Sequence, residues 1–410
     1  MASRKTFSLL GKGLKLDSAE DIAPHIQALK DDPDVEEVQF TGNTLGVGAS
    51  EALAAVLQTK SKLQVVKLDD IFTSRLLSEI PSALEALLQA CLKLPQLHTI
   101  DLSDNAFGLN TQAPLVSFLS QHTPLQHLIL NNNGLGPQAG TYIANALTEL
   151  AAKKAKADAP KLQTVVCGRN RLESGSMEAW AKCYAANTGV QTVKMVQNGI
   201  RQEGVALLLK QGLRNVGSLK VLDLQDNTFT PVGARALGDV IGEWGLLEEL
   251  GVGDCLLSAR GGVMLGEALM NGRNGKLEVL RLQYGDVDAK TVKGLADAVA
   301  AGKLPALRRV ELNGNKFSEE DVHLERLKEA LDERRDEAGA DAEDENWGID
   351  ELDELEEESE EEEEEEAEEE GDEEAKVVEE AKQAQEENVA QEKDKKVDEL
   401  ADLLDKTEIK

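Results

Sequence analysis

The segment LHTIDLSDNAFG (residues 97–108) returns 28 residues later as LQHLILNNNGLG (residues 125–136). Both fit the pattern LxxLxLxxN/CxL. In its LxL part, alternate side chains point to opposite faces, so a short strand buries its leucines and exposes the residues between them. The closing asparagine can hydrogen-bond backbone groups where the chain turns out of the strand. The pattern predicts a repeat that begins with one short strand and one turn.

Ten copies of this pattern run through the chain, most of them 28–30 residues apart. A half-copy, LLGKGLKLDS (residues 9–18), is expected to be the N-terminal cap. Apolar residues between copies recur at helical spacing, as in TPVGARALGDVIGEW (residues 230–244). We therefore predict an α/β leucine-rich repeat solenoid, a ribonuclease-inhibitor-like horseshoe with parallel strands inside and helices outside. Cys255 stands at one ladder position, and the predicted ladder asparagines are Asn43, Asn105, Asn133, Asn170, Asn198, Asn227 and Asn315.

Charge divides the chain into two parts. Residues 341–410 hold 35 acidic and 7 basic residues, which is most of the formal net charge of −33. Such a charge density prevents a core from forming. We predict a repeat domain over residues 1–335 and an acidic, mostly disordered tail over residues 336–410. Two roles for the tail stay open: a non-specific solubilising polyanion, or a segment that steers a basic partner.

The residue inventory argues against a self-contained active site. The four cysteines are far apart, which predicts buried thiols and no metal site. The five histidines are scattered, and no nucleophile, phosphate-loop or zinc motif occurs. No apolar run approaches the length of a membrane span. The acidic balance disfavours nucleic acid, and we expect a soluble monomer without a cofactor of its own.

Two repeats are longer than the rest. The first holds the loop IFTSR (residues 71–75), where Ile71 takes the place of a ladder asparagine and Arg75 is expected on an exposed loop. The second holds AAKKAKADAPK (residues 151–161), which we interpret as a solvated helix extension, with contact to an acidic patch as the alternative. Insertions of this kind lengthen a loop on one face of a solenoid.

The residue just before each ladder position should lie on the rim of the horseshoe. Any one of these residues can be an ordinary surface side chain, but together they predict a mainly acidic rim that suits a basic partner. The rim series is Asp70, Asp104, Asn132, Arg169, Gln197, Asp226, Asp254 and Tyr284. The candidate partner-binding residues are Arg75, Asp70, Asp104, Asn131, Arg169, Lys194, Asp226 and Asp254.

Specific stretches resemble one family. IFTSR followed by EIPSALEALLQAC (residues 79–91), the repeat LNNNGLGPQAGTYIANAL (residues 130–147), and an acidic tail after the last repeat are similar to the Ran GTPase-activating proteins of fungal type. The resemblance covers residues 1–345 by repeat order. Family members usually read FTGR, with glycine where this chain has Ser74.

The resemblance implies an activator of the small GTPase Ran in its GTP form, acting alone or with a Ran-binding protein in the cytoplasm. GTP and Mg²⁺ would be carried by Ran, whose own glutamine orients the attacking water. No arginine finger is implied. The asparagine matching Asn132 orders that glutamine, and the arginine matching Arg75 binds at the interface. Asn131 and Asn133 flank Asn132, so the assignment is open by one position.

A second interpretation stays open. An acidic leucine-rich repeat protein can bind a basic partner without catalysis, as a histone-chaperone-like protein or an inhibitor-like clamp. The long second repeat with Arg75 favours the activator, because a simple clamp does not require it.

Overall fold

Each predicted LxL segment forms a three-residue strand, and the strands lie side by side in one parallel sheet of 12. The ten predicted copies supply β3 and β5 to β13, which confirms the repeat assignment. This computed structural model describes residues 4–341 and 343–356. The strands are β1 (Thr6–Ser8), β3 (Glu37–Gln39), β5 (Val65–Lys67), β6 (Thr99–Asp101), β7 (His127–Ile129), β8 (Thr164–Val166), β9 (Thr192–Lys194), β10 (Val221–Asp223), β11 (Glu249–Gly251), β12 (Val279–Arg281), β13 (Arg309–Glu311) and β14 (Gly348–Ile349).

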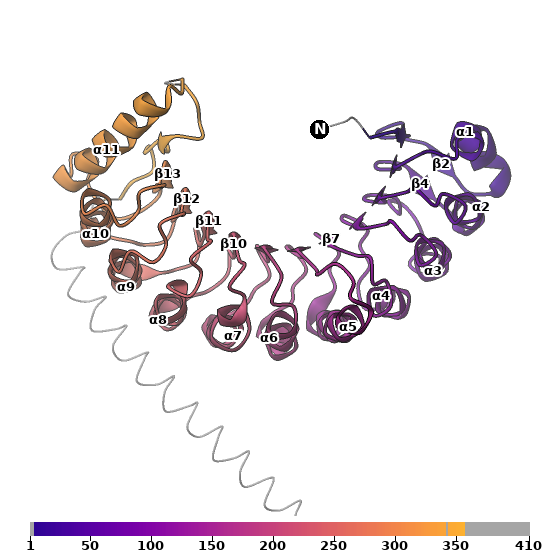
Figure 1. Ribbon diagram of the computed structural model, residues 1–410, viewed down its shortest axis with the longest axis horizontal. Helices are drawn as coiled ribbons and strands as arrows, with labels where there is room; N and C mark the ends of the chain where they lie inside the picture. The colour runs from indigo at the N-terminus through magenta and orange to yellow at the C-terminus, as the bar shows by residue number, and fades with distance from the viewer. Residues whose placement is uncertain (1–3, 342, 357–410) are drawn as a thin grey trace, which may run out of the picture. The chain divides into compact units, whose positions relative to one another are not determined.

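Helices cover the outside of this sheet, and the strands line the inside of the arc (Figure 1). Because a helix is wider than a strand, stacking one of each per repeat curves the solenoid with the strands inward. The predicted α/β horseshoe is confirmed. The helices are α1 (Ala19–Asp31), α2 (Val47–Leu57), α3 (Ile80–Cys91), α4 (Gln112–Leu119), α5 (Gly136–Ala157), α6 (Met177–Ala186), α7 (Gln202–Leu207), α8 (Thr230–Ile241), α9 (Ser258–Met270), α10 (Ala289–Ala300) and α11 (Val322–Ala338).

The ladder asparagines join each repeat to the one before it. Asn105 donates through Nδ2 to the carbonyl of Leu68 at 2.8 Å, and its Oδ1 accepts the backbone N–H of Ile71 at 2.9 Å. All seven predicted ladder asparagines are buried, and Cys255 makes the equivalent contact to the carbonyl of Leu224 at 3.4 Å. These bonds satisfy backbone N–H and C=O groups that the short strands leave without a partner in the sheet. The ladder prediction is therefore confirmed.

The N-terminal half-copy starts the solenoid, as expected. It supplies β2 (Lys15–Leu16), which pairs with β4 (Thr44–Leu45) in a small second sheet, and the residues just before it form β1, which pairs with β3. The side-chain hydroxyl of Ser18 and the carboxylate of Asp21 form a capping box at the start of α1. The cap therefore shields the apolar edge of the first full repeat.

The C-terminal boundary predicted at residue 335 is wrong, because the repeat unit extends to Glu356. After α11 the chain returns to the sheet as β14, which pairs with β13. Asp350 accepts the backbone N–H groups of Leu312 at 2.6 Å and Asn313 at 3.0 Å. The first acidic residues of the expected tail thus cap the solenoid, and residues 357–410, the rest of that prediction, lie outside the described residues.

We expect a protein ending at residue 340 to melt several degrees below one ending at residue 356. The shorter protein loses β14 and leaves the N–H groups of Leu312 and Asn313 without their carboxylate acceptor. It also loses Trp347, which lies 5.8 Å from the guanidinium of Arg308. Thermal unfolding followed by circular dichroism measures the difference. Equal melting temperatures would show that the cap adds no stability.

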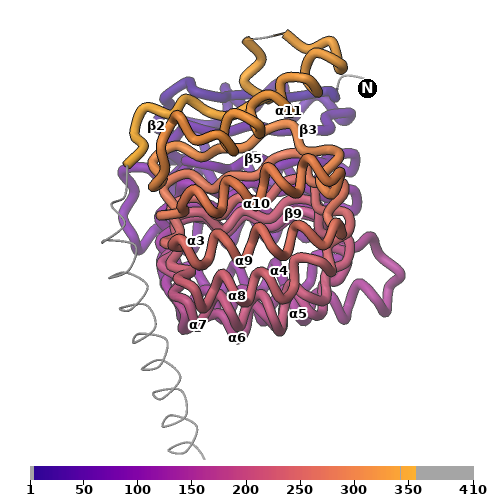
Figure 2. The backbone as a smooth tube through the Cα atoms, turned by 90° about the vertical axis from the view of Figure 1, so that its left-hand side faces the viewer, coloured from indigo at the N-terminus to yellow at the C-terminus, as the bar shows by residue number. Residues whose placement is uncertain are grey.

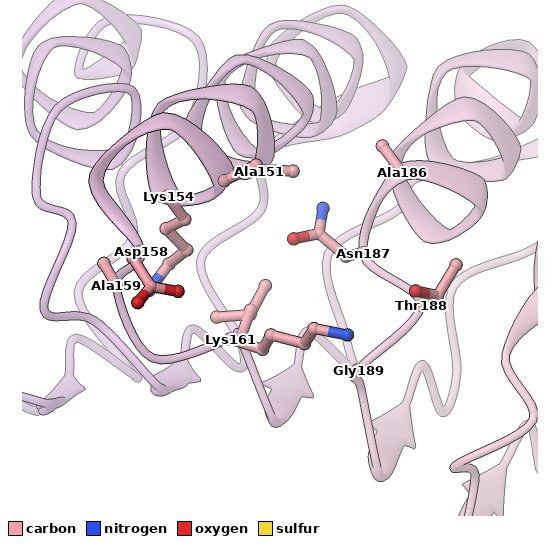
Figure 3. A pocket seen from close by; sticks show the side chains of 11 residues that line it. Ala151, Lys154, Asp158, Ala159, Lys161, Ala186, Asn187, Thr188 and Gly189 are labelled. Atoms are coloured by element: carbon pink, nitrogen blue, oxygen red, sulfur yellow. The ribbon is translucent and has the colours of Figure 1, made fainter.

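The long α5 explains the insertion between β7 and β8. The helix runs to Ala157, and its C-terminal end projects beyond its neighbours in Figure 2. The predicted helix extension is confirmed. Beneath this end lies a cavity of about 300 Å³ (Figure 3), whose lining includes Lys154 and Asn187. Both donate to main-chain carbonyls, Lys154 to Thr123 at 2.7 Å and Asn187 to Cys183 at 3.0 Å, so they serve the scaffold.

His122 gives the fold a predictable sensitivity to acid. Its buried ring stacks on Phe118, and Nε2 donates to the carbonyl of Leu97 at 2.7 Å, which places a proton on Nε2. Burial lowers the pKa of His122 from 6.5 to about 4. Because the folded pKa is depressed, the unfolded chain takes up the proton first, and this stability is lost as the pH falls from about 6.5 toward 4.

We expect the wild-type protein to lose about 2 kcal/mol more unfolding free energy between pH 7 and pH 5 than a His122→Gln variant. The variant keeps every carboxylate, so the difference between the two proteins isolates the histidine. Urea unfolding at the two pH values measures it. Parallel pH dependences in the two proteins would contradict the assignment.

Candidate functional site

All eight residues of the predicted rim share one backbone conformation. Their φ angles lie between 47° and 60°, the left-handed region, and Gly42 and Gly314 take the same position in two other repeats. Aspartate, asparagine and glycine tolerate this conformation best. The acidic character of the rim is therefore partly a requirement of the turn. Arg169, Gln197 and Tyr284 are not explained in this way.

Asn132 is the exposed asparagine of the NNN turn. Its Nδ2 donates to Oδ1 of Asp104 at 2.7 Å, which fixes the amide in one orientation. The second N–H and the carbonyl oxygen of this amide make no hydrogen bond within the described part of the chain. An amide held in this way can donate and accept at once toward a partner side chain.

Of the three asparagines in this turn, Asn132 is the one whose side chain is exposed. Asn133 is fully buried in the ladder, where its Oδ1 accepts the N–H of Asn105 at 3.0 Å. Asn131 is half-buried, and its Oδ1 accepts the N–H of Gly168 at 2.7 Å. Both side chains hold adjacent repeats together. Asn131, predicted to bind a partner, is thus engaged by the scaffold.

Carboxylates gather in the repeats that precede Asn132. Burial raises the pKa of Asp101, and the nearby charges of Asp69 and Asp104 raise it further. Asp69 accepts from the hydroxyl of Thr41 at 2.8 Å. Asp104 is exposed beside them and orients Asn132. The cluster places negative charge where a partner would meet the amide.

Arg75 does not lie free on an exposed loop, and that prediction is wrong. Its side chain is 7% exposed and turns back toward the first repeat. Nε donates to Oγ1 of Thr44 at 2.7 Å, Nη2 donates to the carbonyls of Leu16 and Thr44, and Nη1 pairs with Asp17. The guanidinium therefore fastens the long loop to the N-terminal cap.

The loop that Arg75 holds has two further features. Ser74 has a φ of 65°, so the position where the family usually has glycine does need a left-handed backbone. Leu76 and Leu77 are 67% and 62% exposed, which periodicity did not predict because they fall between the loop and α3. Phe72 is buried and lies 6.3 Å from Phe107, which anchors the loop on the next repeat.

The remaining candidates fall into two places. Arg169, Asp226 and Asp254 lie in the turns after β8, β10 and β11, on the same edge as Asn132. Burial and the charge of Asp254 raise the pKa of Asp226. Lys194 lies instead on β9, inside the arc, so the structure separates it from the rim.

The cysteines and the other possible metal ligands show no reactive or metal-binding arrangement in the described residues. Burial raises the pKa of each of the four free thiols to about 12, which confirms the buried-thiol prediction. Among residues 4–341 and 343–356, no three histidine, cysteine or acidic side chains converge as metal ligands. Within the same residues, no helix has the length and apolar character needed to cross a bilayer.

Comparison with known proteins finds a matching family model and several similar proteins. Residues 218–238 match the model of the family described as Leucine Rich repeat. Ran GTPase-activating protein 1 of Saccharomyces cerevisiae is 38% identical over 336 residues, 80% of this chain and 83% of that protein. Ran GTPase-activating protein 2 of Caenorhabditis elegans is 41% identical over 208 residues, 50% of this chain but 22% of that longer protein.

The structure of the leucine-rich repeat-containing protein LegL7 from Legionella pneumophila is also similar, with a TM-score of 0.44 and 15% identity over 82% of this chain and 99% of that one. The yeast match is far stronger in sequence and covers most of both chains. By this match, the chain belongs to the Ran GTPase-activating protein family.

Proposed function

We propose that this chain stimulates GTP hydrolysis by the small GTPase Ran. Membership of the family supports the activity, and the exposed, oriented amide of Asn132 is the observation that carries the mechanism. Hydrolysis in small GTPases depends on positioning the attacking water and stabilising charge, and a glutamine of the GTPase orients that water. Asn132 hydrogen-bonds this glutamine and holds it in its productive orientation.

The mechanism uses no arginine finger. An arginine finger must reach the transferred phosphoryl group, whereas the Arg75 guanidinium is bonded to Thr44, Leu16 and Asp17. Arg75 acts instead as a positioning residue that fixes the loop beside the contact surface. GTP and Mg²⁺ belong to the partner, and this chain supplies no cofactor.

The electrostatics of the rim support binding to a basic face of Ran in its GTP form, with or without a Ran-binding protein. Complementary charge raises the association rate in a salt-dependent way. The chain acts as a monomer in the cytoplasm, where it keeps Ran in the GDP form and so gives nuclear transport its direction.

The proposed function is tested by measuring whether the protein acts catalytically on Ran-GTP. A substoichiometric amount of the protein is added to purified Ran loaded with GTP, and released phosphate is measured against time. We expect phosphate in many-fold molar excess over the added protein, well ahead of the intrinsic rate. A non-catalytic clamp would bind Ran without this acceleration, so binding with unchanged phosphate release would favour the clamp.

A further inference from the structure

The turn after β8 carries two exposed arginines in an unusual backbone. Arg169 and Arg171 lie on either side of the buried Asn170, with φ angles of 54° and 53°. Long side chains rarely adopt this conformation, because their Cβ crowds the following carbonyl oxygen. The turn after β7 has the favourable residues at the same two positions, Asn132 and Gly134.

The described structure gives these two arginines little internal support. Within residues 4–341 and 343–356, neither guanidinium forms a hydrogen bond or a close ion pair, and the one charge interaction is that of Arg169 with Asp226, whose pKa it lowers. Other arginines of the sheet region are paired, since Arg281 of β12 lies 3.3 Å from Glu249, and Arg308, just before β13, lies 3.1 Å from Glu278. Backbone strain that no internal contact offsets is a feature of functional sites.

The two arginines also break the charge pattern of the rim. Asp104 stands on one side, two repeats before Arg169, and Asp226 and Asp254 stand on the other. Parallel strands are spaced by about 5 Å, so the arginine turn directly adjoins the Asn132 turn. A short basic segment thus interrupts an acidic edge immediately beside the proposed catalytic amide.

We propose that Arg169 and Arg171 bind carboxylates on the surface of the GTP-loaded partner and fix its register against Asn132. This inference rests on the proposed function. A guanidinium presents a planar fork that matches a carboxylate in a bidentate contact. A basic turn between acidic turns makes one docking position of the partner favourable. A partner shifted along the rim by one repeat would bring like charges together.

The partner group is a carboxylate and not the transferred phosphate. A side chain that stabilises a reacting group must be held in place by contacts of its own. Asn132 meets this requirement through its hydrogen bond to Asp104, whereas neither arginine makes a hydrogen bond in the described residues and Arg169 has only a charge interaction with Asp226. They are free to adapt to a docking surface.

The test replaces both arginines by the residues of the preceding turn, as Arg169→Asn with Arg171→Gly. We expect the melting temperature to rise by about 1–3 °C, because both substitutions relieve left-handed strain. The KM for Ran-GTP should rise about tenfold or more, with kcat unchanged at saturation. Leu256→Gly is the matched control, since Leu256 occupies the Arg171 position of a later turn with φ 50° and is 51% exposed. It should raise stability without changing KM.

Three results distinguish a failure of the inference about the two arginines from a failure of the proposed function. An unchanged KM in the double variant, with an active wild-type protein, overturns this inference alone. A fall in kcat at saturation with an unchanged KM also overturns it, because the arginines would then act on the phosphoryl group. A wild-type protein that does not stimulate hydrolysis overturns the proposed function, and this inference with it.

Discussion

Replacing Asn132 by glycine lowers the maximal rate of Ran-bound GTP hydrolysis by about a hundredfold, while binding of Ran-GTP weakens less than tenfold. The magnitude is that of removing one preorganised hydrogen-bonding group from a transition state. The loss falls on the maximal rate because ordering the glutamine matters for the chemical step more than for docking.

Glycine is the appropriate substitution at this position. Asn132 has a φ of 50°, where alanine would add backbone strain, and two other repeats already carry glycine there, Gly42 and Gly314. The variant should therefore keep its melting temperature. Single-turnover rates at saturating protein separate the maximal rate from binding.

Two matched variants sharpen the test of Asn132. Asn132→Asp keeps the shape and tolerates the backbone but cannot donate, so it should be nearly as impaired as the glycine variant. Asp104→Gly suits the left-handed φ of 60° at that position and leaves the amide in place without its 2.7 Å hydrogen bond, and we expect a smaller loss of rate. A glycine variant that hydrolyses at close to the wild-type maximal rate would remove Asn132 from the mechanism.

Arg75→Ala should reduce activity below detection and destabilise the protein by about 2–4 kcal/mol. The substitution removes four hydrogen bonds and leaves the carbonyls of Leu16 and Thr44 without these donors. It also releases the loop that carries Ser74, Leu76 and Leu77, at the edge beside the site. Activity is lost because this edge no longer has a fixed shape.

The matched substitutions at this site distinguish bracing from direct contact. Arg75→Lys should fail to restore activity, because an ammonium cannot reproduce the planar fork that reaches Thr44 and Leu16 together. Asp17→Ala should have little effect, because Asp17 is 54% exposed and such pairs contribute little. An inactive Arg75→Ala protein with wild-type unfolding free energy would instead make Arg75 a partner contact.

Repetition made most of the fold predictable. The LxL spacing and the ladder asparagines each recur, so one interpretation explained ten strands and seven buried side chains. β14 was not predicted, because its sequence occurs only once and lies in an acidic segment. Ile349 of this strand and the following Leu352 and Leu355 pack on the core, but the many acidic residues around them masked this apolar pattern in the sequence.

Those parts of the site that follow from the repeat pattern itself could be predicted from the sequence. Contacts between residues far apart in the chain could not. The rim positions follow from the ladder, so Asn132 could be placed on the correct edge. The left-handed turns are indicated only by an excess of aspartate, asparagine and glycine, and Arg171 was missed because it looks like an ordinary surface cation. Arg75 finds Asp17 58 residues away, a contact that no local pattern contains.

The most direct test of the account is the single-turnover rate of GTP hydrolysis by Ran at a saturating concentration of this protein. We expect an increase of several orders of magnitude over Ran alone, of the size that activators give to small GTPases. A rate equal to that of Ran alone, with binding demonstrated in the same solution, would contradict it.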